Sequence, residues 1–210
     1  MADTDPGSAP VEMRVLLVRH GQSTWNAEGR WQGSADPPLS VLGEHQARAA
    51  GEAVEHLGVQ RVVTSDLERA RRTGELLSPD GMPIAVDAAL RERHAGEWEG
   101  LSREEIEAGY PGFLAAHRSP PGFEDDETLL ARVLPAVGAL LGDPTADVTL
   151  VVTHGGVIRT LERHLGAPEA PVPNLGGRWL RRTASAPLVL GEREVLIDPD
   201  VVALTVPDQL

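Results

Sequence analysis

Two residue types are absent from this 210-residue chain, cysteine and lysine. The absence of cysteine excludes disulfide bonds, thiolate metal sites and cysteine nucleophiles. Without lysine the chain can form neither a Schiff base nor the lysine–phosphate contact of a P-loop. All 19 basic residues are arginines. An anion-binding site must therefore be built from arginine, histidine, backbone N–H groups and helix ends.

Basic residues are also outnumbered by acidic ones, and the net charge is −13. Because nucleic acids and anionic membranes bind basic surfaces, neither is an expected partner. No apolar run approaches the length that spans a bilayer. Residues 1–12 are acidic and rich in Pro, Gly and Ala, so we expect a disordered tail rather than a secretory signal. A cytoplasmic location is expected from this lack of an export signal.

Apolar strands alternate with helical segments along residues 13–210, which we expect to form a single domain. Strands are predicted at 15–18, 61–64, 83–86 and 148–152, and helices at 41–57, 67–77 and 127–141, between Gly156 and Leu165, and after the capping box Ser102–Glu105. Terminal strands are predicted at 186–190, 194–197 and 201–206, the first two joined by a turn at 191–192. The alternation is typical of an α/β layer fold with a mostly parallel sheet.

The two most hydrophobic strands end in the same way. The first runs into Arg19-His20-Gly21 and the second into Thr153-His154-Gly155. Ligands of open α/β sheets bind outside the carboxyl ends of the strands. We therefore expect His20 and His154 to converge, although they are far apart in sequence.

A third segment, residues 64–73, places arginines in the first turns of a helix, where the helix dipole favours an anion. Glu68 and Arg72 are four residues apart and are predicted to form an exposed ion pair. Arg69 is the arginine closest to the helix start without such a partner. It is therefore the candidate anion ligand, whereas Arg71 and Arg72 are typical of a solvated face.

A fourth segment, residues 90–100, mixes charges of both signs and offers a carboxylic acid. Glu92 lies between two arginines, and Glu97 and Glu99 flank Trp98. Composition alone does not choose among these three acids.

Two histidines, arginines and a carboxyl group favour phosphoryl transfer over two alternatives. In a metal site, Arg19 and Arg69 would repel a dication. A serine triad is disfavoured because Gly21–Trp25 is not a nucleophile elbow. Arginine forks match phosphate oxygens, a histidine can attack phosphorus, and a carboxylic acid can protonate the leaving oxygen.

The motifs resemble those of the histidine phosphatase superfamily, in its phosphoglycerate mutase-like branch. The resemblance spans about residues 13–165 in family order and rests on five segments: Arg19–Asn26, Gln32-Gly33 with Leu39-Ser40, Ser65–Ala70, Leu90–Glu92 with Gly96–Gly100, and Val152–Gly156. It implies a three-layer α/β/α fold with a mostly parallel central sheet. It also implies a reaction without a metal or other cofactor.

The resemblance also implies the roles of the site residues. His20 would be the nucleophile that becomes phosphorylated, and Glu92 would be the acid that later activates water. Arg19, Arg69 and His154 would bind the phosphoryl group. The residues implied to line the pocket or bind phosphate around them are Gln22, Ser23, Asn26, Gly33 and Gly155. The resemblance, not the chemistry, chooses Glu92 over Glu97 and Glu99.

Three functions remain open at this point. A phosphatase that hydrolyses small-molecule phosphomonoesters is favoured, because residues 101–126 are compact and Pro120–Glu124 resembles a phosphatase-type stretch. A bisphosphoglycerate-dependent mutase is disfavoured, since such mutases resemble each other in a long insertion with a lysine and paired arginines. The third is a non-catalytic module that binds a phosphorylated ligand, against which the presence of His20, Glu92 and His154 argues.

The expected partner is a small phosphorylated metabolite, and a homodimer is possible by resemblance. We expect residues 29–37, 101–123 and 166–182 to determine substrate specificity. The spacing of their residues does not indicate which substrate they bind. Trp31 and Trp98 can border the pocket or simply pack. His94 is a weak pocket candidate, and His117 is given no role.

Overall fold

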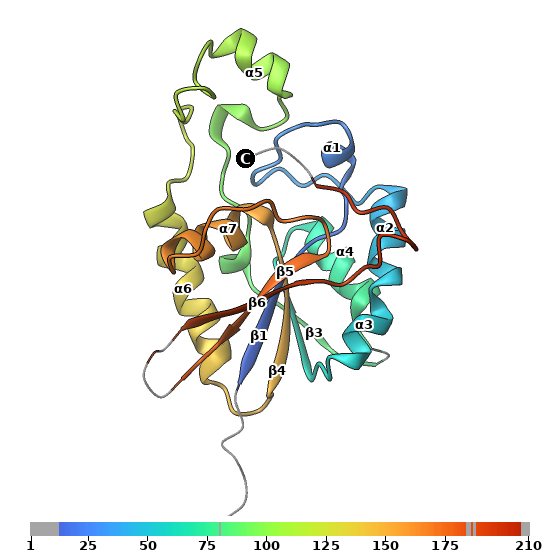
Figure 1. Ribbon diagram of the computed structural model, residues 1–210. Helices are drawn as coiled ribbons and strands as arrows, with labels where there is room; N and C mark the ends of the chain where they lie inside the picture. Colours follow the sequence, from blue (N-terminus) through green and yellow to red (C-terminus); the bar gives the residue numbers. More distant parts are fainter. Residues whose placement is uncertain (1–12, 80, 184–185, 187, 207–210) are drawn as a thin grey trace, which may run out of the picture.

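The computed structural model describes residues 13–79, 81–183, 186 and 188–206, and within them six strands form one sheet (Figure 1). The strands are β1 (Arg14–Arg19), β2 (Arg61–Thr64), β3 (Ile84–Val86), β4 (Val148–Thr153), β5 (Gly176–Arg181) and β6 (Val189–Val195), in the spatial order β3-β2-β4-β1-β5-β6. β1, β2, β3 and β4 pair in parallel, whereas β5 is antiparallel to β1 and to β6. The mostly parallel sheet predicted from the sequence is confirmed.

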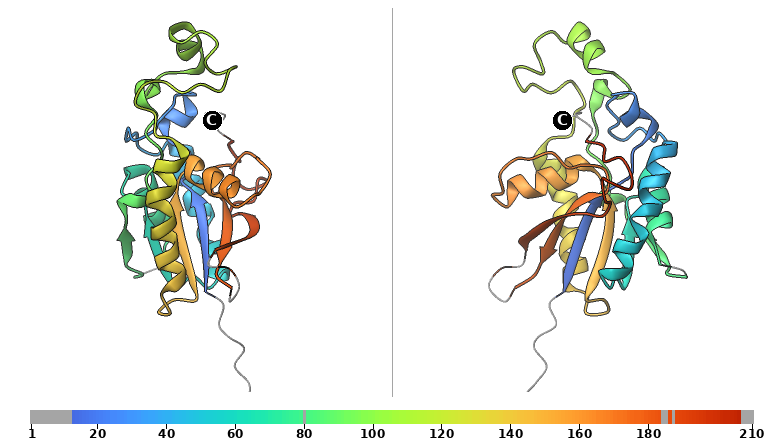
Figure 2. Two further views of the ribbon diagram at one scale, coloured as in Figure 1. Left: turned by 90° about the vertical axis from the view of Figure 1, so that its left-hand side faces the viewer. Right: turned by 45° about the vertical axis from the view of Figure 1, so that its right-hand side comes forward.

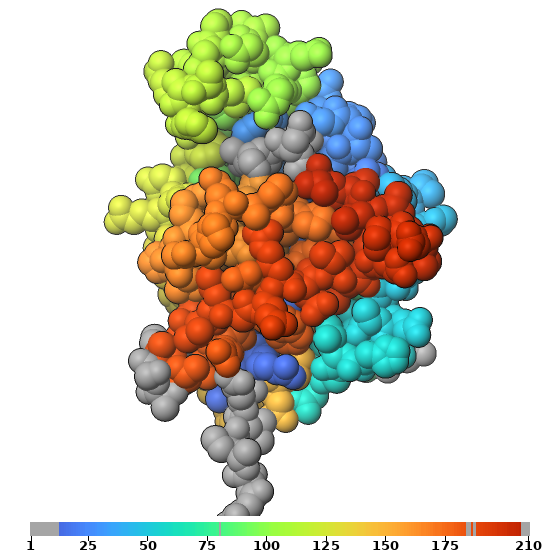
Figure 3. Space-filling model, viewed as in Figure 1, coloured from blue at the N-terminus to red at the C-terminus, as the bar shows by residue number. Residues whose placement is uncertain are grey.

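Helices cover both faces of this sheet and form the predicted three layers (Figures 1 and 2). One face carries α2 (Val41–Ala49), α3 (Gly51–His56) and α4 (Glu68–Leu77), and the other carries α6 (Asp126–Gly142) and α7 (Gly155–His164). The short elements α1 (Thr24–Ala27), η1 (Ala88–Leu90), η2 (Gly96–Trp98) and α5 (Arg103–Gly109) lie in the loops that connect strands and helices. Residues around α5 lie above the carboxyl ends of the strands in Figure 1, and they project from the rest of the molecule in Figure 3.

Strand β1 packs against the helices on both faces of the sheet, because successive side chains of a strand point to opposite faces. Val15 and Leu17 pack toward α6 and α7, and Leu16 and Val18 pack toward α2, α3 and α4. All four are at most 1% exposed. This continuous apolar run is typical of a central strand that is buried on both faces. It fixes the point at which the chain leaves the sheet, directly before His20.

The predicted helix 41–57 is two helices, since α2 ends at Ala49, Ala50 caps both helices and Gly51 begins α3. Glycine is a poor helix former, which favours a break at this point. Pro135, by contrast, lies inside one continuous α6. The helix at Ser102 begins with the predicted capping box.

The prediction for the C-terminal region was wrong in part, because the strands expected at 186–190 and 194–197 overlap one continuous strand, β6. The expected hairpin turn at 191–192 lies inside the single strand β6, residues 201–206 form no strand, and β5 was not predicted. Gly191 lies against β5, where an added Cβ would be 2.8 Å from the Cβ of Trp179. Gly177 of β5 would clash in the same way, at 2.0 Å from the carbonyl oxygen of Leu17. These glycines permit close strand packing rather than a turn, and a single sequence does not distinguish the two uses.

The predicted disordered tail, residues 1–12, lies outside the described residues. Among the helices that are described, none is both long and apolar enough to cross a membrane.

Candidate active site

Polar side chains from four segments lie together at the carboxyl edge of the sheet. Arg19 and His20 follow β1 and His154 follows β4, so the parallel pairing of β1 with β4 brings the two histidines to the same edge. Their ring centroids are 5.2 Å apart. Arg69, in the first turn of α4, and Glu92, just after η1, line a cavity of about 30 Å³ with Arg19 and His20. The structure therefore brings together the five residues that the sequence assigns to phosphoryl transfer.

His20 is a neutral imidazole whose Nε2 carries a lone pair. Its Nδ1 is 2.6 Å from the carbonyl oxygen of Gly21, which can only accept a hydrogen bond, so Nδ1 carries the proton. Burial, followed by the positive charges of Arg69 and Arg19, lowers the pKa of His20 well below 6.5. Its Nε2 accepts a hydrogen bond from Nε of Arg69 at 3.3 Å. This tautomer is the one that a nucleophilic imidazole needs.

His154 is a second buried imidazole with its pKa well below 6.5, chiefly because of burial and then because of the charge of Arg69. Its Nε2 is 2.9 Å from the hydroxyl oxygen of Ser65. Within the described residues, Nδ1 of His154 and Nε of Arg19 are buried without a hydrogen-bond partner. Since buried polar atoms are normally hydrogen-bonded, these two atoms suit the oxygens of a bound phosphoryl group.

Backbone carbonyl groups hold both arginines in place. Arg19 donates from Nη1 to the oxygen of Val172 at 2.8 Å. Arg69 donates to Ala35 at 2.7 Å and to Gly33 at 2.9 Å. Burial is the main reason that the pKa of Arg19 falls to about 9 and that of Arg69 to about 10. Both remain cations at neutral pH, and two fixed guanidinium groups next to a neutral histidine form an anion site.

Two backbone N–H groups orient the carboxylate of Glu92. Arg93 N donates to Oε1 at 2.8 Å, and Gly156 N donates to Oε2 at 2.9 Å. Gly156 is the second residue of α7, where the helix dipole also favours a negative charge. The carboxyl group is thus held at a fixed point of the small cavity, beside the nucleophile.

The other two acids of the fourth segment have different partners. Glu97 accepts a hydrogen bond from the hydroxyl of Tyr110. Glu99 accepts from the backbone N–H of Ser34 at 2.7 Å and supports the loop on which Gly33 lies. Of the three carboxyl groups, Glu92 is the one that lines the small cavity.

Replacing Gly156 with alanine is expected to lower kcat about 10²-fold, because displacing a catalytic group by about 1 Å has an effect of this size. The added Cβ would be 2.2 Å from Oε1 of Glu92, so the carboxylate must move. Gly138→Ala is the matched control, since its Cβ would meet nothing within 4 Å. The control should keep its kcat and gain about 0.5–1 kcal/mol of stability. An unchanged kcat in Gly156→Ala would show that this position of Glu92 does not matter.

The buried histidines should make the protein less stable as the pH falls below 6.5. In the unfolded chain they take up protons near pH 6.5, whereas burial keeps them neutral in the folded state to much lower pH. The unfolded state then binds more protons, and each histidine removes up to about 1.4 kcal/mol of stability per pH unit. Urea unfolding at pH 7.0 and 5.5 measures this loss. It should be smaller in His154→Gln, and an equal loss would contradict the assignment.

Three residues predicted to line the pocket are engaged in the loop after β1. Ser23 is the N-cap of α1, accepts from Asn26 N at 3.0 Å and donates to Gln32 Oε1 at 2.7 Å. Gln22 accepts from the hydroxyl of Ser40 at 2.7 Å. The lining of the small cavity includes Gln32 but not Gln22, Ser23 or Asn26. A binding role for these three stays a prediction.

Both predicted glycines contact the arginines. Gly33 lines the small cavity and has a φ of +54°, which favours glycine, and its carbonyl accepts from Arg69. Gly155 begins α7 and packs against the guanidinium of Arg19, where an added Cβ would be 3.1 Å from Nη1.

Arg72, expected to pair with Glu68, pairs with Glu44 and Glu75 instead.

No sequence pattern pointed to Asn174, which is fully buried behind the nucleophile. Its Nδ2 donates to the backbone oxygen of His20 at 2.8 Å, and its Oδ1 accepts from the hydroxyl of Thr205 at 2.7 Å. The next residue, Leu175, donates from its N–H to the oxygen of Arg19. The segment before β5 thus positions the backbone of Arg19 and His20. It has no periodic sequence pattern from which this role could have been predicted.

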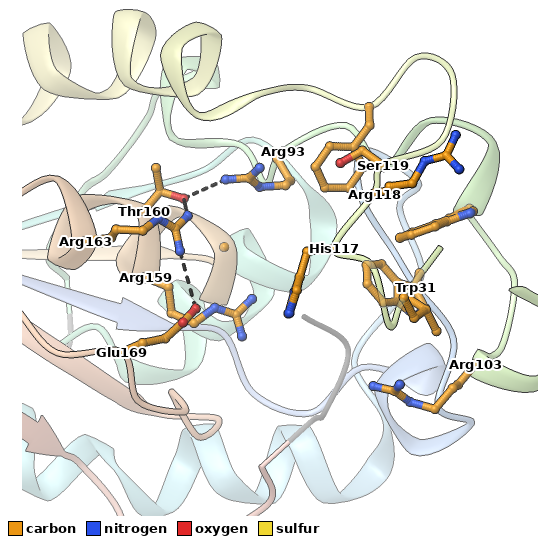
Figure 4. Close-up of a pocket in the computed structure, with 14 residues that line it drawn as sticks. Trp31, Arg93, Arg103, His117, Arg118, Ser119, Arg159, Thr160, Arg163 and Glu169 are labelled. Atoms are coloured by element: carbon orange, nitrogen blue, oxygen red, sulfur yellow. Dashed lines mark hydrogen bonds and ion pairs between the residues drawn. The ribbon is translucent and has the colours of Figure 1, made fainter. Parts of the chain in front are cut away.

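A larger cavity of about 460 Å³ adjoins the small one and shares Trp31 and Arg93 with it (Figure 4). It lies between α7 and the residues that follow α5, which supply Gly156, Arg159, Thr160 and Arg163 on one side and Leu114, His117, Arg118 and Ser119 on the other. Trp31 and Trp98 both line it, and His94 does not. Sequence reasoning missed Arg159 and His117, because neither belongs to a recognisable motif.

The comparison with protein families matches residues 15–184 to the histidine phosphatase superfamily (branch 1). Glucosyl-3-phosphoglycerate phosphatase of Mycolicibacterium vanbaalenii is 38% identical over 178 residues, covering 78% of this chain and 79% of that protein. Probable phosphoglycerate mutase GpmB of Salmonella paratyphi B is 36% identical over 156 residues, covering 68% and 70%.

Solved structures agree with the family match. A protein described as mycobacterial hydrolase 1 superposes with a TM-score of 0.78 and 31% identity, covering 86% of this chain and 97% of that chain. A mycobacterial glucosyl-3-phosphoglycerate phosphatase in complex with VO3 superposes with a TM-score of 0.77 and 31% identity, covering 86% and 98%. The predicted family fold is therefore confirmed.

Proposed function

The chain belongs to the histidine phosphatase superfamily and is a phosphatase, and from this premise we propose that it hydrolyses small-molecule phosphomonoesters through a phosphohistidine on His20. The observation that carries the proposal is the neutral His20, with its protonated Nδ1 on Gly21 and its Nε2 beside Arg69 and Glu92. The substrate is a phosphorylated metabolite. Because such anions do not cross membranes unaided, a cytoplasmic location belongs to the same proposal.

In the first step, Nε2 of His20 attacks phosphorus and the bond from phosphorus to the ester oxygen breaks. The carboxylic acid of Glu92 gives its proton to the leaving oxygen. Arg19, Arg69 and His154 hold the three remaining phosphoryl oxygens, and their fixed positions account for most of the stabilisation. The products of this step are the alcohol and a phosphohistidine.

In the second step, water attacks the phosphorus of the phosphohistidine. The Glu92 carboxylate takes a proton from this water, and the bond between phosphorus and Nε2 breaks. Inorganic phosphate leaves and His20 returns to its neutral form. The acid of the first step is thus the base of the second, so the site is restored without a metal or another cofactor.

The test is a panel of phosphomonoesters assayed for phosphate release in the presence of a chelator. A rapid quench in alkali or detergent with ³²P-labelled substrate should trap a phosphoenzyme that is stable to base and labile to acid. Release of phosphate from several esters together with this intermediate supports the proposal. Absence of turnover across the panel, or turnover that the chelator abolishes, contradicts it.

A phosphoglycerate mutase is the second candidate, because relatives 36% identical to this chain are described as probable mutases. The absence of lysine and the short segment between α5 and α6 disfavour it. With 3-phosphoglycerate and 2,3-bisphosphoglycerate present, a mutase would form 2-phosphoglycerate faster than inorganic phosphate. A phosphatase would do the opposite.

A further inference from the structure

The larger cavity lies where the leaving group of the substrate must go. The two backbone N–H groups that bind the Glu92 carboxylate belong to Arg93 and Gly156, and both residues also line the larger cavity. Glu92 gives its proton to the leaving oxygen. The organic part of the substrate therefore extends past Glu92 into the 460 Å³ cavity.

The lining of this cavity is cationic, although the chain as a whole carries a net charge of −13. Glu169 contributes a carboxylate to it. Five arginines and one histidine contribute basic side chains, namely Arg93, Arg103, Arg118, Arg159, Arg163 and His117. An excess of this kind inside an acidic protein raises the local concentration of anions. The remaining wall includes the apolar side chains of Trp31, Trp98, Leu114 and Phe123, which suit the carbon skeleton of a ligand.

Asp126 forms ion pairs with two of these arginines. Arg93 donates to Asp126 at 2.6 Å, and Arg163 pairs with the same carboxylate at 2.8 Å. Arg163 also reaches Glu169 at 3.4 Å, which places Glu169 against Arg163 on the wall of the cavity (Figure 4). Arg118 lies over the ring of Phe113 at 4.0 Å from its centroid.

Arg159 extends from α7 into the cavity, and the ring of His117 extends toward it from the opposite side (Figure 4). The charge of Arg159 also acts on the catalytic residues. It lowers the pKa of Arg19, although burial of Arg19 has the larger effect. Burial is in turn the main reason that the pKa of Arg159 itself is lowered, and the carboxylates of Glu92 and Glu169 act in the opposite direction. A cation partly removed from water gains most from an anion that enters the same space.

We propose that this cavity binds a second anionic group of the substrate, a carboxylate or a second phosphate, with Arg159 as its main contact and His117 opposite. The proposal rests on the phosphatase function above and defines its substrate class as phosphomonoesters that carry another negative charge on the leaving group. The volume leaves room for a leaving group larger than glycerate. The substrate is thus recognised at both ends by arginine, in a chain without lysine.

The experiment compares two matched pairs of substrates. One pair is 3-phosphoglycerate against glycerol 3-phosphate, which lacks the carboxylate, and the other is propane-1,3-diol bisphosphate against the monophosphate. The measured quantity is the ratio of kcat/KM between the charged and the uncharged member. A ratio of 10 or more in the wild type supports the proposal, and the pair with the larger ratio identifies the anion.

Arg159→Met should lower this ratio about 10- to 100-fold, mainly through a higher KM for the charged member, because a charge-assisted contact is lost. Arg159→Lys keeps the charge without the fork and should restore part of the ratio. Arg71→Met, on the exposed face of α4, is the control and should leave the ratio unchanged.

Three results would overturn the inference. They are a wild-type ratio near 1 for both pairs, an unchanged ratio in Arg159→Met, and an equal loss in Arg71→Met. In each case a trapped phosphoenzyme would leave the phosphatase function standing. If the wild type hydrolyses no ester and forms no phosphoenzyme, the proposed function fails and this inference fails with it.

Discussion

Replacing His20 with alanine is expected to lower kcat about 10⁴- to 10⁶-fold, since removing a nucleophile from an interdependent site has an effect of this size. No other described side chain pairs a buried, neutral imidazole with the position between Arg19, Arg69 and Glu92. Phosphate release from p-nitrophenyl phosphate and the amount of trapped phosphoenzyme measure the loss. Both should disappear together.

His45→Ala is the matched control for this prediction. His45 is an exposed residue of α2 and lacks the burial of His20, so its loss should change neither measurement. His154→Gln should lower kcat by a smaller factor, about 10²–10³, and still form phosphoenzyme, because it removes one contact rather than the nucleophile. A phosphoenzyme that persists in His20→Ala would show that another residue is the nucleophile.

Replacing Glu92 with glutamine is expected to lower kcat about 10²- to 10⁴-fold for an alkyl phosphate, the usual contribution of a general acid or base. Glutamine keeps an oxygen that can accept from Gly156 N but has no proton of the required acidity. The formation of phosphoenzyme should be slowed much less for p-nitrophenyl phosphate, because nitrophenolate leaves readily without a proton. Single-turnover kinetics with both substrates measure the difference.

Glu97→Gln is the control that separates Glu92 from its neighbours. Glu97 accepts from Tyr110 in the segment around η2 and α5, so its substitution should leave the rates of both substrates unchanged. Equal slowing of the alkyl and the nitrophenyl ester in Glu92→Gln would contradict the role of acid. It would indicate that Glu92 only positions the phosphoryl group.

The sequence predicted the part of the fold that local patterns encode. Leu16, Leu17 and the rest of the first apolar run predicted a central strand, because a parallel strand buried on both faces reads as a continuous apolar stretch. The capping box at Ser102 predicted the start of α5 for a similarly local reason. At the C-terminal end β5 escaped prediction and β6 was predicted as two strands joined by a turn, since the glycines of β5 and β6 serve contacts with Leu17 and Trp179 on the neighbouring strands.

The candidate site divides in the same way. The sequence by itself determined which chemistry is available: a chain without cysteine or lysine, with His20 and His154 after its two strongest strands, must bind phosphate through arginine and histidine. It did not separate Glu92 from Glu97 and Glu99 without the family resemblance.

Only the tertiary structure decided how these groups work. The tautomer of His20 depends on the carbonyl of Gly21, the orientation of Glu92 depends on the N–H of Gly156, and the cavity around Arg159 depends on α7 facing the residues after α5. The physical reason is that burial and distance between remote segments set these properties. Residue identity sets which reactions are possible, whereas the packing of distant residues sets where the charge, the proton and the empty space lie.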